Sequence, residues 1–213
     1  MEKIAIVGGG GFGREVKCLI DDINEKTLLY DLVGFYDDAP NIAKTNGIKY
    51  LGQILNLNRV DYPLNVVLAI ADPEAKENII KMLDNVNLSF PNLFHPSVIK
   101  SKDEVYFGHG NVICAGNILT CNITVNNFVT INLGCTIGHD TAIEDYCSLM
   151  PNVNVSGDVI LYEKAYIGTG ATIINKVSVG RKTIVGAGAV VSRSLPDDCT
   201  AVGIPAKPIK FGK

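Results

Sequence analysis

Two adjacent residues near the middle of the chain have side chains that suit proton transfer. His139 and Asp140 lie in the segment Ile137-Gly138-His139-Asp140. A neutral imidazole takes up a proton close to neutral pH, which is what a general base must do. A carboxylate beside it can orient the ring and stabilise the imidazolium that forms. The alternative interpretation is a solvated surface turn, because adjacency in the sequence does not establish contact.

A second candidate site is the glycine-rich segment GGGGFG at residues 8–13. It follows an apolar run and opens a helical pattern, as a phosphate-binding turn must. Gly8, Gly10 and Gly13 satisfy the pattern GxGxxG, and Asp37 follows further along the chain at the end of the next apolar run, which favours a dinucleotide such as NAD. Against NAD, the α/β unit spans only about 90 residues, roughly half of a dinucleotide fold. Glycine-rich turns also occur simply because they pack closely.

Residues 1 to about 90 alternate between strand and helix patterns. Strands are expected at Lys3–Val7, Leu32–Tyr36, Ile48–Leu51 and Asn65–Ile70, and helices at about 14–23 and 74–83. Alternation of this kind is typical of a parallel sheet covered by helices. The glycine turn follows the first of these strands directly.

The second half of the chain carries a six-residue repeat. Every sixth residue from Phe107 to Val191 is Phe, Leu, Ile or Val, fifteen in a row, and a second row four positions further on holds mostly small or β-branched side chains. A period of six fits short strands joined by turns, with one aliphatic and one small residue pointing inward from each strand. Three hexads make one coil, so we expect a parallel β-helix of about five coils. The spacing does not determine its handedness.

The repeat also places the candidate base. His139 is the second residue after the aliphatic Ile137, on a turn between two faces, so its side chain should project outward. Gly157 follows three hexads later, one coil away at the same corner, where its backbone N–H can approach the same cleft. The alternative for Gly157 is a turn glycine with a positive φ. Cys135 and Cys147 fall in the small inward row, so we interpret them as core residues rather than nucleophiles.

The composition excludes several classes of protein. The chain has 213 residues, a net charge of −3, 47% hydrophobic residues and 7% aromatic residues without any Trp. It is too apolar for a disordered chain. The scarcity of aromatic rings has two interpretations, which are scatter in the composition and an interior that excludes bulky side chains. Lys and Arg form no cluster that would indicate nucleic acid or an anionic membrane as a partner. Without a secretion signal, a run of the ~18 to 20 apolar residues that span a bilayer, or metal-ligand spacing among the six Cys, we expect a cytoplasmic protein with reduced thiols.

Several segments together resemble a known family. They are Ile137-Gly138-His139-Asp140, NVSGDV (154–159), YIGTGATI (166–173), VGAGAVV (185–191) and VGIPAKPI (202–209). These resemble the hexapeptide-repeat acyltransferases, which have a left-handed β-helix. With the N-terminal βαβ unit, the whole chain resembles the subgroup of sialic acid O-acetyltransferases and bacillosamine or perosamine N-acetyltransferases. The resemblance implies an α/β plus all-β protein, with a small Rossmann-like nucleotide-sugar-binding domain at 1–90 and a β-helix acyltransferase domain with a C-terminal tail at 91–213.

The resemblance also implies a reaction. Acetyl-CoA would donate an acetyl group to an amino or hydroxyl group of a sugar in surface-glycan synthesis, and no metal is expected. His139 would be the general base, and the Gly157 N–H would donate to the thioester oxygen. Thr169 and Ala187 would contact the pantetheine of acetyl-CoA, and Lys207 would lie near its phosphates. The donor would lie in a groove between two subunits of a homotrimer.

The sugar acceptor is assigned by the same resemblance to the N-terminal domain. The expected contacts are Gly10, Gly11, Phe12, Gly13, Asp37, Asp38 and Ser148. Relatives often carry His at the positions of Phe12 and Ser148, and both would face the acceptor, so the identity of the acceptor stays open. Serine or another small molecule is one alternative acceptor. From other classes, an NAD-binding oxidoreductase and a non-catalytic β-helix scaffold also stay open.

Overall fold

The N-terminal domain is a parallel sheet with helices packed on it. The computed structural model describes residues 1–39, 47–102 and 104–212. Five strands form the sheet in the order β3-β2-β1-β4-β5, and each neighbouring pair is parallel. The elements are β1 (Glu2–Val7), α1 (Gly11–Thr27), β2 (Tyr30–Tyr36), β3 (Tyr50–Gly52), a 3-10 helix (Ile54–Arg59), β4 (Leu64–Leu68), α2 (Pro73–Met82) and β5 (Leu88–Ser89). The expected elements form, and α1 is longer than expected because the helix already begins inside the glycine turn and continues to Thr27.

The strand order reverses between β1 and β4, which creates a binding position at their carboxyl ends. The Ala69 N–H donates to the Val7 carbonyl at 2.8 Å, so the residues after these two strands stay side by side. The glycine turn and the start of α2 both lie at this edge. Asp72 caps α2, because its carboxylate accepts a hydrogen bond from the Ala75 N–H at 2.8 Å. Ligands of open parallel sheets bind at such a reversal point.

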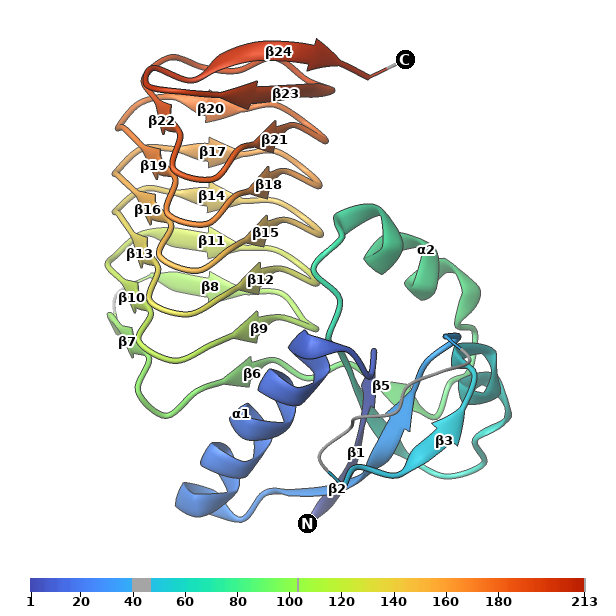
Figure 1. Ribbon diagram of the computed structural model, residues 1–213. Helices are drawn as coiled ribbons and strands as arrows, with labels where there is room; N and C mark the ends of the chain where they lie inside the picture. The colour runs from blue at the N-terminus through green and yellow to red at the C-terminus, as the bar shows by residue number, and fades with distance from the viewer. Residues whose placement is uncertain (40–46, 103, 213) are drawn as a thin grey trace.

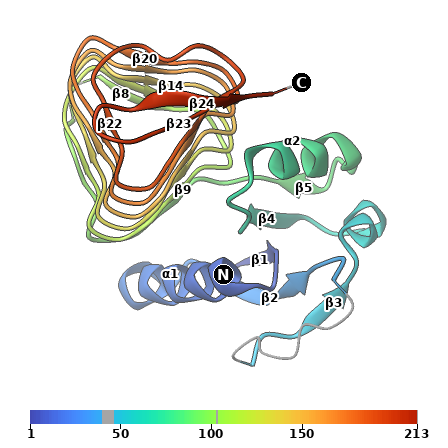
Figure 2. The ribbon, with the colours of Figure 1, turned by 45° about the horizontal axis from the view of Figure 1, so that its top comes forward.

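The rest of the chain winds into a parallel β-helix with three flat faces (Figures 1 and 2). The first face contains β6-β9-β12-β15-β18-β21-β23-β24, the second β7-β10-β13-β16-β19-β22 and the third β8-β11-β14-β17-β20. The strands are β6 (Leu93–Phe94), β7 (Ile99–Lys100), β8 (Val105–Phe107), β9 (Val112–Ile113), β10 (Ile118–Leu119), β11 (Ile123–Val125), β12 (Thr130–Ile131), β13 (Thr136–Ile137), β14 (Ala142–Ile143), β15 (Ser148–Leu149), β16 (Asn154–Val155), β17 (Ile160–Leu161), β18 (Tyr166–Ile167), β19 (Thr172–Ile173), β20 (Ser178–Val179), β21 (Ile184–Val185), β22 (Val190–Val191), β23 (Cys199–Val202) and β24 (Lys207–Phe211).

The two inward rows of the hexad pattern form the interior of this β-helix. Strands pair at a spacing of three hexads, as in Ile137↔Val155. Every member of the aliphatic row is buried except Phe107, which is partly buried, and every member of the second row is buried except Val177. The buried hydrophobic members of the two rows are Ile, Leu, Val, Ala and Cys, and the buried polar members are Asn111, Asn117, Thr141 and Thr183. A narrow interior of this kind explains the scarcity of rings in the composition.

The β-helix is longer than the five coils expected from the hexads. Its second face alone contains six strands. The solenoid already begins at Leu93, upstream of the first hexad of the uninterrupted row. Here the sequence pattern is interrupted, yet the backbone ladder continues, since Leu93↔Val112 still pair in parallel. At the other end, β24 runs antiparallel to β23 and covers the last coil.

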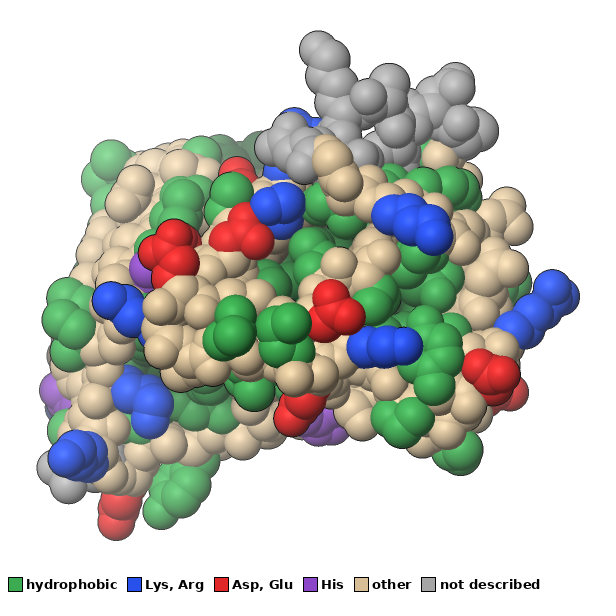
Figure 3. Space-filling model, turned by 90° about the horizontal axis from the view of Figure 1, so that it is seen from below, with side chains coloured by type: hydrophobic (Ala, Val, Ile, Leu, Met, Phe, Trp, Pro, Cys, Tyr) green, Lys and Arg blue, Asp and Glu red, His purple; other side chains and the backbone are tan. Residues whose placement is uncertain are grey.

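The N-terminal domain packs on the first face of the β-helix (Figure 2). Helix α1 shares a core with the first coils, in which Leu19 and Ile20 meet Leu93 and Val112. The predicted boundary at residues 90 and 91 falls between the end of β5 and the start of β6. Seen from below, Lys and Arg side chains stand singly among Asp and Glu side chains (Figure 3). Within the described residues, no helix combines the length and apolarity needed to cross a membrane.

Candidate active site

His139 and Asp140 form a hydrogen-bonded pair where the second face turns into the third, which we call the second corner. His139 Nδ1 lies 2.6 Å from Asp140 Oδ2. Asn122, one coil earlier, donates to the other carboxylate oxygen of Asp140 at 3.1 Å. The hydrogen bonds from His139 and Asn122 hold the pKa of Asp140 below its usual value. An ionised carboxylate only accepts hydrogen bonds, so Nδ1 is the donor and Nε2 keeps a free lone pair.

The imidazole lies directly over Gly157. A Cβ placed on Gly157 would come within 2.5 Å of both Cε1 and Nε2 of His139. The φ of Gly157 is not in the left-handed region, so the interpretation as a turn glycine with positive φ is wrong. Glycine is needed here because the ring leaves no room for a side chain. Within the described residues, no acceptor takes a hydrogen bond from the Gly157 N–H.

The residues expected to contact acetyl-CoA lie at another corner of the prism. Thr169 follows β18 and Ala187 follows β21, where the first face turns into the second, which we call the first corner. Their coils are adjacent, and the Gly188 N–H donates to the Thr169 carbonyl at 2.8 Å. Lys207 is exposed at the start of β24. A single chain therefore holds the expected donor contacts and His139 on different edges.

The glycine turn combines packing glycines with an open helix end. A Cβ on Gly8, which has a φ of +103°, would lie 2.8 Å from the Ala69 carbonyl oxygen, and a Cβ on Gly13 would overlap the Gly8 carbonyl oxygen. Gly10 has no neighbouring atom within 4 Å of its Cβ position, and Gly11 has only the Arg14 guanidinium at 3.9 Å. The first N–H groups of a helix have no intrahelical partner. Gly10 and Gly11 thus leave an accessible set of donors suited to an anion.

The other predicted acceptor residues of this domain make backbone contacts around the turn. Asp37 Oδ2 accepts a hydrogen bond from the Gly9 N–H at 2.7 Å. Asp38 Oδ1 accepts one from the Ile54 N–H at 2.9 Å. Phe12 is partly buried and packs against the core shared by α1 and the β-helix. Asp37 therefore holds the glycine turn, and its Oδ1 accepts a hydrogen bond from the Ala39 N–H at 2.8 Å, whereas Asp38 holds the start of the 3-10 helix.

Ser148 is fully buried between the two domains. Its hydroxyl lies 2.9 Å from Lys76 Nζ, which α2 inserts against the first face. Sequence reasoning missed Lys76, because a lysine in an amphipathic helix is normally placed in solvent. The signal available was its position, three residues before the buried Ile79 on the same helix face.

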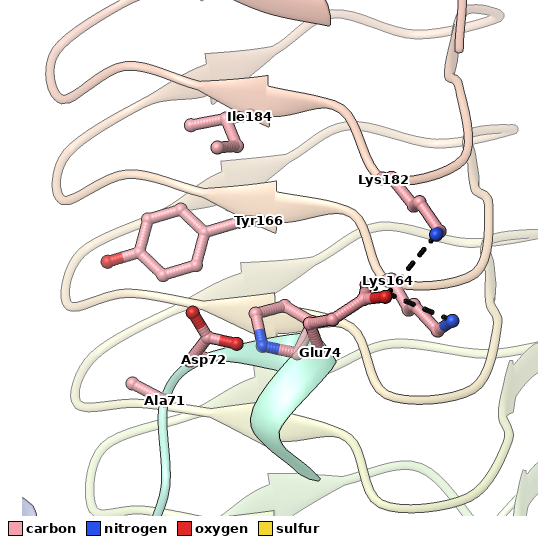
Figure 4. Close-up of a pocket in the computed structure, with 8 residues that line it drawn as sticks. Ala71, Asp72, Glu74, Lys164, Tyr166, Lys182 and Ile184 are labelled. Atoms are coloured by element: carbon pink, nitrogen blue, oxygen red, sulfur yellow. Dashed lines mark hydrogen bonds and ion pairs between the residues drawn. The ribbon is translucent and has the colours of Figure 1, made fainter. Parts of the chain in front are cut away.

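A chamber of about 500 Å³ lies between the start of α2 and the β-helix (Figure 4). We call the edge where the third face turns into the first face the third corner. The chamber opens at this corner, beside the carboxyl end of β4. The ring of Tyr166 and the side chain of Ile184 form one side, and Glu74 pairs with Lys182 at 3.4 Å and Lys164 at 3.9 Å across it. The lining residues are Ala71, Asp72, Pro73, Glu74, Lys164, Tyr166, Lys182 and Ile184.

The cysteines of the inward row do not suit nucleophilic catalysis. Burial raises the pKa of Cys135 to about 11 and that of Cys147 to about 12, so both stay thiols at neutral pH. Among the described residues, no group of three or more His, Cys, Asp or Glu side chains is arranged to hold a metal ion.

Comparisons with known proteins cover almost the whole chain. Residues 3–83 match the PglD N-terminal domain. The GDP-perosamine N-acetyltransferase of Escherichia coli O157:H7 is 27% identical over 217 residues, covering 99% of this chain and 97% of that protein. PerB from Caulobacter crescentus, solved with CoA and GDP-perosamine, is 29% identical with a TM-score of 0.86 over 99% of this chain and 98% of its own. The acetyltransferase domain of PglB from Neisseria gonorrhoeae FA1090, solved with acetyl-CoA, is 28% identical with a TM-score of 0.89, over 98% and 99%.

These similarities extend over both domains, in the same order along the chain. They overturn the interpretations as an NAD-binding oxidoreductase and as a non-catalytic scaffold, because proteins similar over almost the whole chain are acetyltransferases. Acetyl-CoA is the co-substrate of this class. The chain thus belongs to the hexapeptide-repeat acyltransferases, in the subgroup of acetyl-CoA-dependent sugar acetyltransferases.

Proposed function

We propose that the protein transfers an acetyl group from acetyl-CoA to the amino group of a nucleotide-linked amino sugar in surface-glycan synthesis. The observation that carries this proposal is the second corner, where the His139 imidazole, oriented by Asp140, lies over the backbone of Gly157. A base and an N–H donor at one point are what acyl transfer needs. The whole-chain similarity to a protein solved with CoA and GDP-perosamine supports an amino-sugar nucleotide as the acceptor.

Transfer occurs directly within a ternary complex. The acceptor nitrogen attacks the carbonyl carbon of the thioester, and His139 Nε2 takes a proton from that nitrogen. The carbonyl oxygen becomes an oxyanion, which accepts a hydrogen bond from the Gly157 N–H. Collapse of the intermediate breaks the C–S bond, and the imidazolium returns the proton to the CoA sulfur. The buried thiols of Cys135 and Cys147 support direct attack, because neither offers a thiolate.

The active unit is a homotrimer of left-handed β-helices. Thr169 and Ala187 follow strands of the first face, whereas His139 follows a strand of the second, so one subunit does not complete the site. Cyclic assembly joins different surfaces of neighbouring subunits, which lets the second corner of one subunit face the first face of the next. Lys207, exposed beyond the last coil, then meets the phosphates of CoA at the end of the groove.

The acceptor lies along the edge where β1 and β4 end. The open N–H groups at Gly10 and Gly11 suit the diphosphate of a nucleotide sugar, and the Asp37 and Asp38 carboxylates suit its ribose or base, since each carboxylate oxygen can accept more than one hydrogen bond. The sugar then extends into the chamber beside α2, against Tyr166. Ser148 acts behind the chamber wall rather than in contact with the sugar, since Lys76 covers its hydroxyl.

The test is thiol release from acetyl-CoA with a panel of acceptors. The panel contains nucleotide-linked 4-amino sugars, sialic acid and serine. We expect release with an amino-sugar nucleotide, and a loss of about 10²- to 10⁴-fold in kcat for His139→Asn, with the trimer retained in light scattering. Near wild-type turnover by His139→Asn would contradict the mechanism. Faster release with serine than with every sugar would contradict the proposed acceptor.

A further inference from the structure

Lys76 is a fully buried lysine at the contact between the two domains. It lies in α2 of the N-terminal domain, and its side chain enters the first face of the β-helix between β12 and β15. Figures 1 and 2 both show α2 beside this face. Lysine is almost never fully buried unless it has partners. Its position therefore calls for a reason beyond the filling of space.

The ammonium group is held entirely by oxygen atoms of the β-helix. Nζ donates to the Phe128 carbonyl at 2.8 Å, the Ser148 hydroxyl at 2.9 Å and the Cys147 carbonyl at 3.1 Å. The hydroxyl of Thr130 lies further away, at 3.4 Å. Three close acceptors match the three protons of an ammonium group. Burial lowers the pKa of Lys76 to about 7, because removal of the amine from water disfavours its charged form.

These contacts connect two coils of the β-helix to the helix that forms one wall of the chamber. Asp72 and Glu74 line the chamber and precede Lys76 by one turn or less. One residue after Lys76, Glu77 pairs with Lys164 of the third corner at 2.7 Å. Hydrogen bonds weaken steeply when their distance or angle changes. These hydrogen bonds therefore fix α2 at one position on the β-helix, whereas a purely apolar contact would allow α2 to slide along it.

We propose that Lys76 is a positioning residue for the transfer reaction, which fixes the α2 wall of the chamber on the β-helix and so sets where the acceptor sits relative to the thioester. This role rests on the proposed function. Ser148 contributes to the same positioning, because its hydroxyl accepts a hydrogen bond from Lys76. Displacement of reacting groups by about 1 Å costs about 10²-fold in rate, so a wall that shifts affects transfer without any contact between Lys76 and the substrates.

The first test is Lys76→Met, compared with Lys81→Met as a matched control. Methionine fills a similar volume without the amine, and replacing a buried charge by an apolar side chain is often tolerated. Lys81 lies on the same helix but is exposed and paired with Glu77. For Lys76→Met we expect kcat/KM for the amino-sugar nucleotide to fall about 10- to 100-fold, with the KM for acetyl-CoA within twofold. Lys81→Met should match the wild type in both constants.

A second variant covers the case in which Lys76→Met does not fold. Ser148→Ala removes one of three acceptors and should lower kcat/KM for the acceptor severalfold. Wild-type kcat/KM in Ser148→Ala alone would contradict the positioning role. Where Lys76→Met folds, adding Ser148→Ala to it should have no further effect, because the interaction is already gone. Additive effects of the two substitutions on kcat/KM would contradict the proposal that Lys76 and Ser148 act through one interaction.

Hydrogen exchange separates failure of this proposal from failure of the proposed function. In Lys76→Met, amide exchange should rise in α2 and β15 and stay unchanged in β19 and β22, far along the helix. Raised exchange together with unchanged kcat/KM for the acceptor would overturn the positioning role and leave the transferase intact. Loss of affinity for acetyl-CoA and acceptor alike would also overturn it. A wild type inert toward every amino-sugar nucleotide would instead overturn the proposed function.

Discussion

The β-helix and the N-terminal domain build their interiors in different ways. In the β-helix each inward position is repeated three hexads later in the next coil, so a residue such as Leu149 stacks between Ile131 and Ile167. In the N-terminal domain β1 lies between β2 and β4, which are far apart in the sequence. In a repeat, the position of a residue in the period therefore determines its face or corner. In a sheet of distant strands, which residues meet at an edge is determined only when the strands assemble.

The two regions also use glycine for different reasons. Gly157 has no left-handed φ, and it is glycine because the His139 ring occupies the space of a side chain. Gly8 has a φ of +103° and also lies against the Ala69 carbonyl. The corner of the β-helix therefore needs glycine because a side chain from the neighbouring coil occupies the space, and the turn of the sheet needs it for the backbone path.

After His139→Asn, the largest effect is expected from Gly157→Ala, which tests whether spacing along the repeat is enough to build the site. The new methyl group would displace the exposed imidazole from the Gly157 N–H. We expect kcat to fall about 10²- to 10³-fold, the loss typical of a disturbed oxyanion donor, with an unchanged Tm. Ser156→Ala, at the exposed neighbouring position, should keep wild-type kinetics. If Gly157→Ala keeps full activity, the close approach of ring and glycine has no role in transfer.

A core substitution in each region tests whether the repeat unfolds by neighbouring coils. Leu149→Ala removes a fully buried side chain and should cost about 2 to 5 kcal/mol in denaturant unfolding. Hydrogen exchange should rise first in the coils above and below, because each coil contacts only its neighbours. Ile6→Ala, in β1 of the N-terminal sheet, should instead raise exchange across that sheet. If either variant raises exchange equally in the β-helix and the N-terminal sheet, the two regions do not unfold separately.

The smallest effect is a pH dependence that arises where the two regions meet. The folded state lowers the pKa of Lys76 to about 7 from its usual 10.5, so the unfolded chain binds more protons between these values. Lys76 should therefore make the free energy of unfolding rise between pH 7 and 8, by at most about 1.4 kcal/mol per unit. Denaturant unfolding in this range, below the pH at which the cysteines of the unfolded chain ionise, should show a steeper rise in the wild type than in Lys76→Met. If the free energy of unfolding changes with pH in the same way in the wild type and in Lys76→Met, Lys76 stays protonated when buried.

The sequence predicted the repeat region closely and the acceptor region only in outline. The hexad rows identified the interior of the β-helix and the outward corner of His139, because a regular ladder converts spacing into position. The count of five coils was too low, since the pattern is irregular where β6 pairs with β9. Ser148 was expected to face the acceptor, but the distant Lys76 covers it.

By itself, the sequence determined which residues point into the β-helix, which follow the first strand as a glycine turn, and that His139 and Gly157 share a corner. The inward rows and the shared corner follow from a local period that the backbone must repeat, and the glycine turn follows from its place directly after an apolar run. Only the packing of the two domains placed Lys76 of α2 in the first face, covered Ser148 and formed the chamber beside α2. Contacts between distant segments depend on how whole elements pack, and no local spacing encodes that packing.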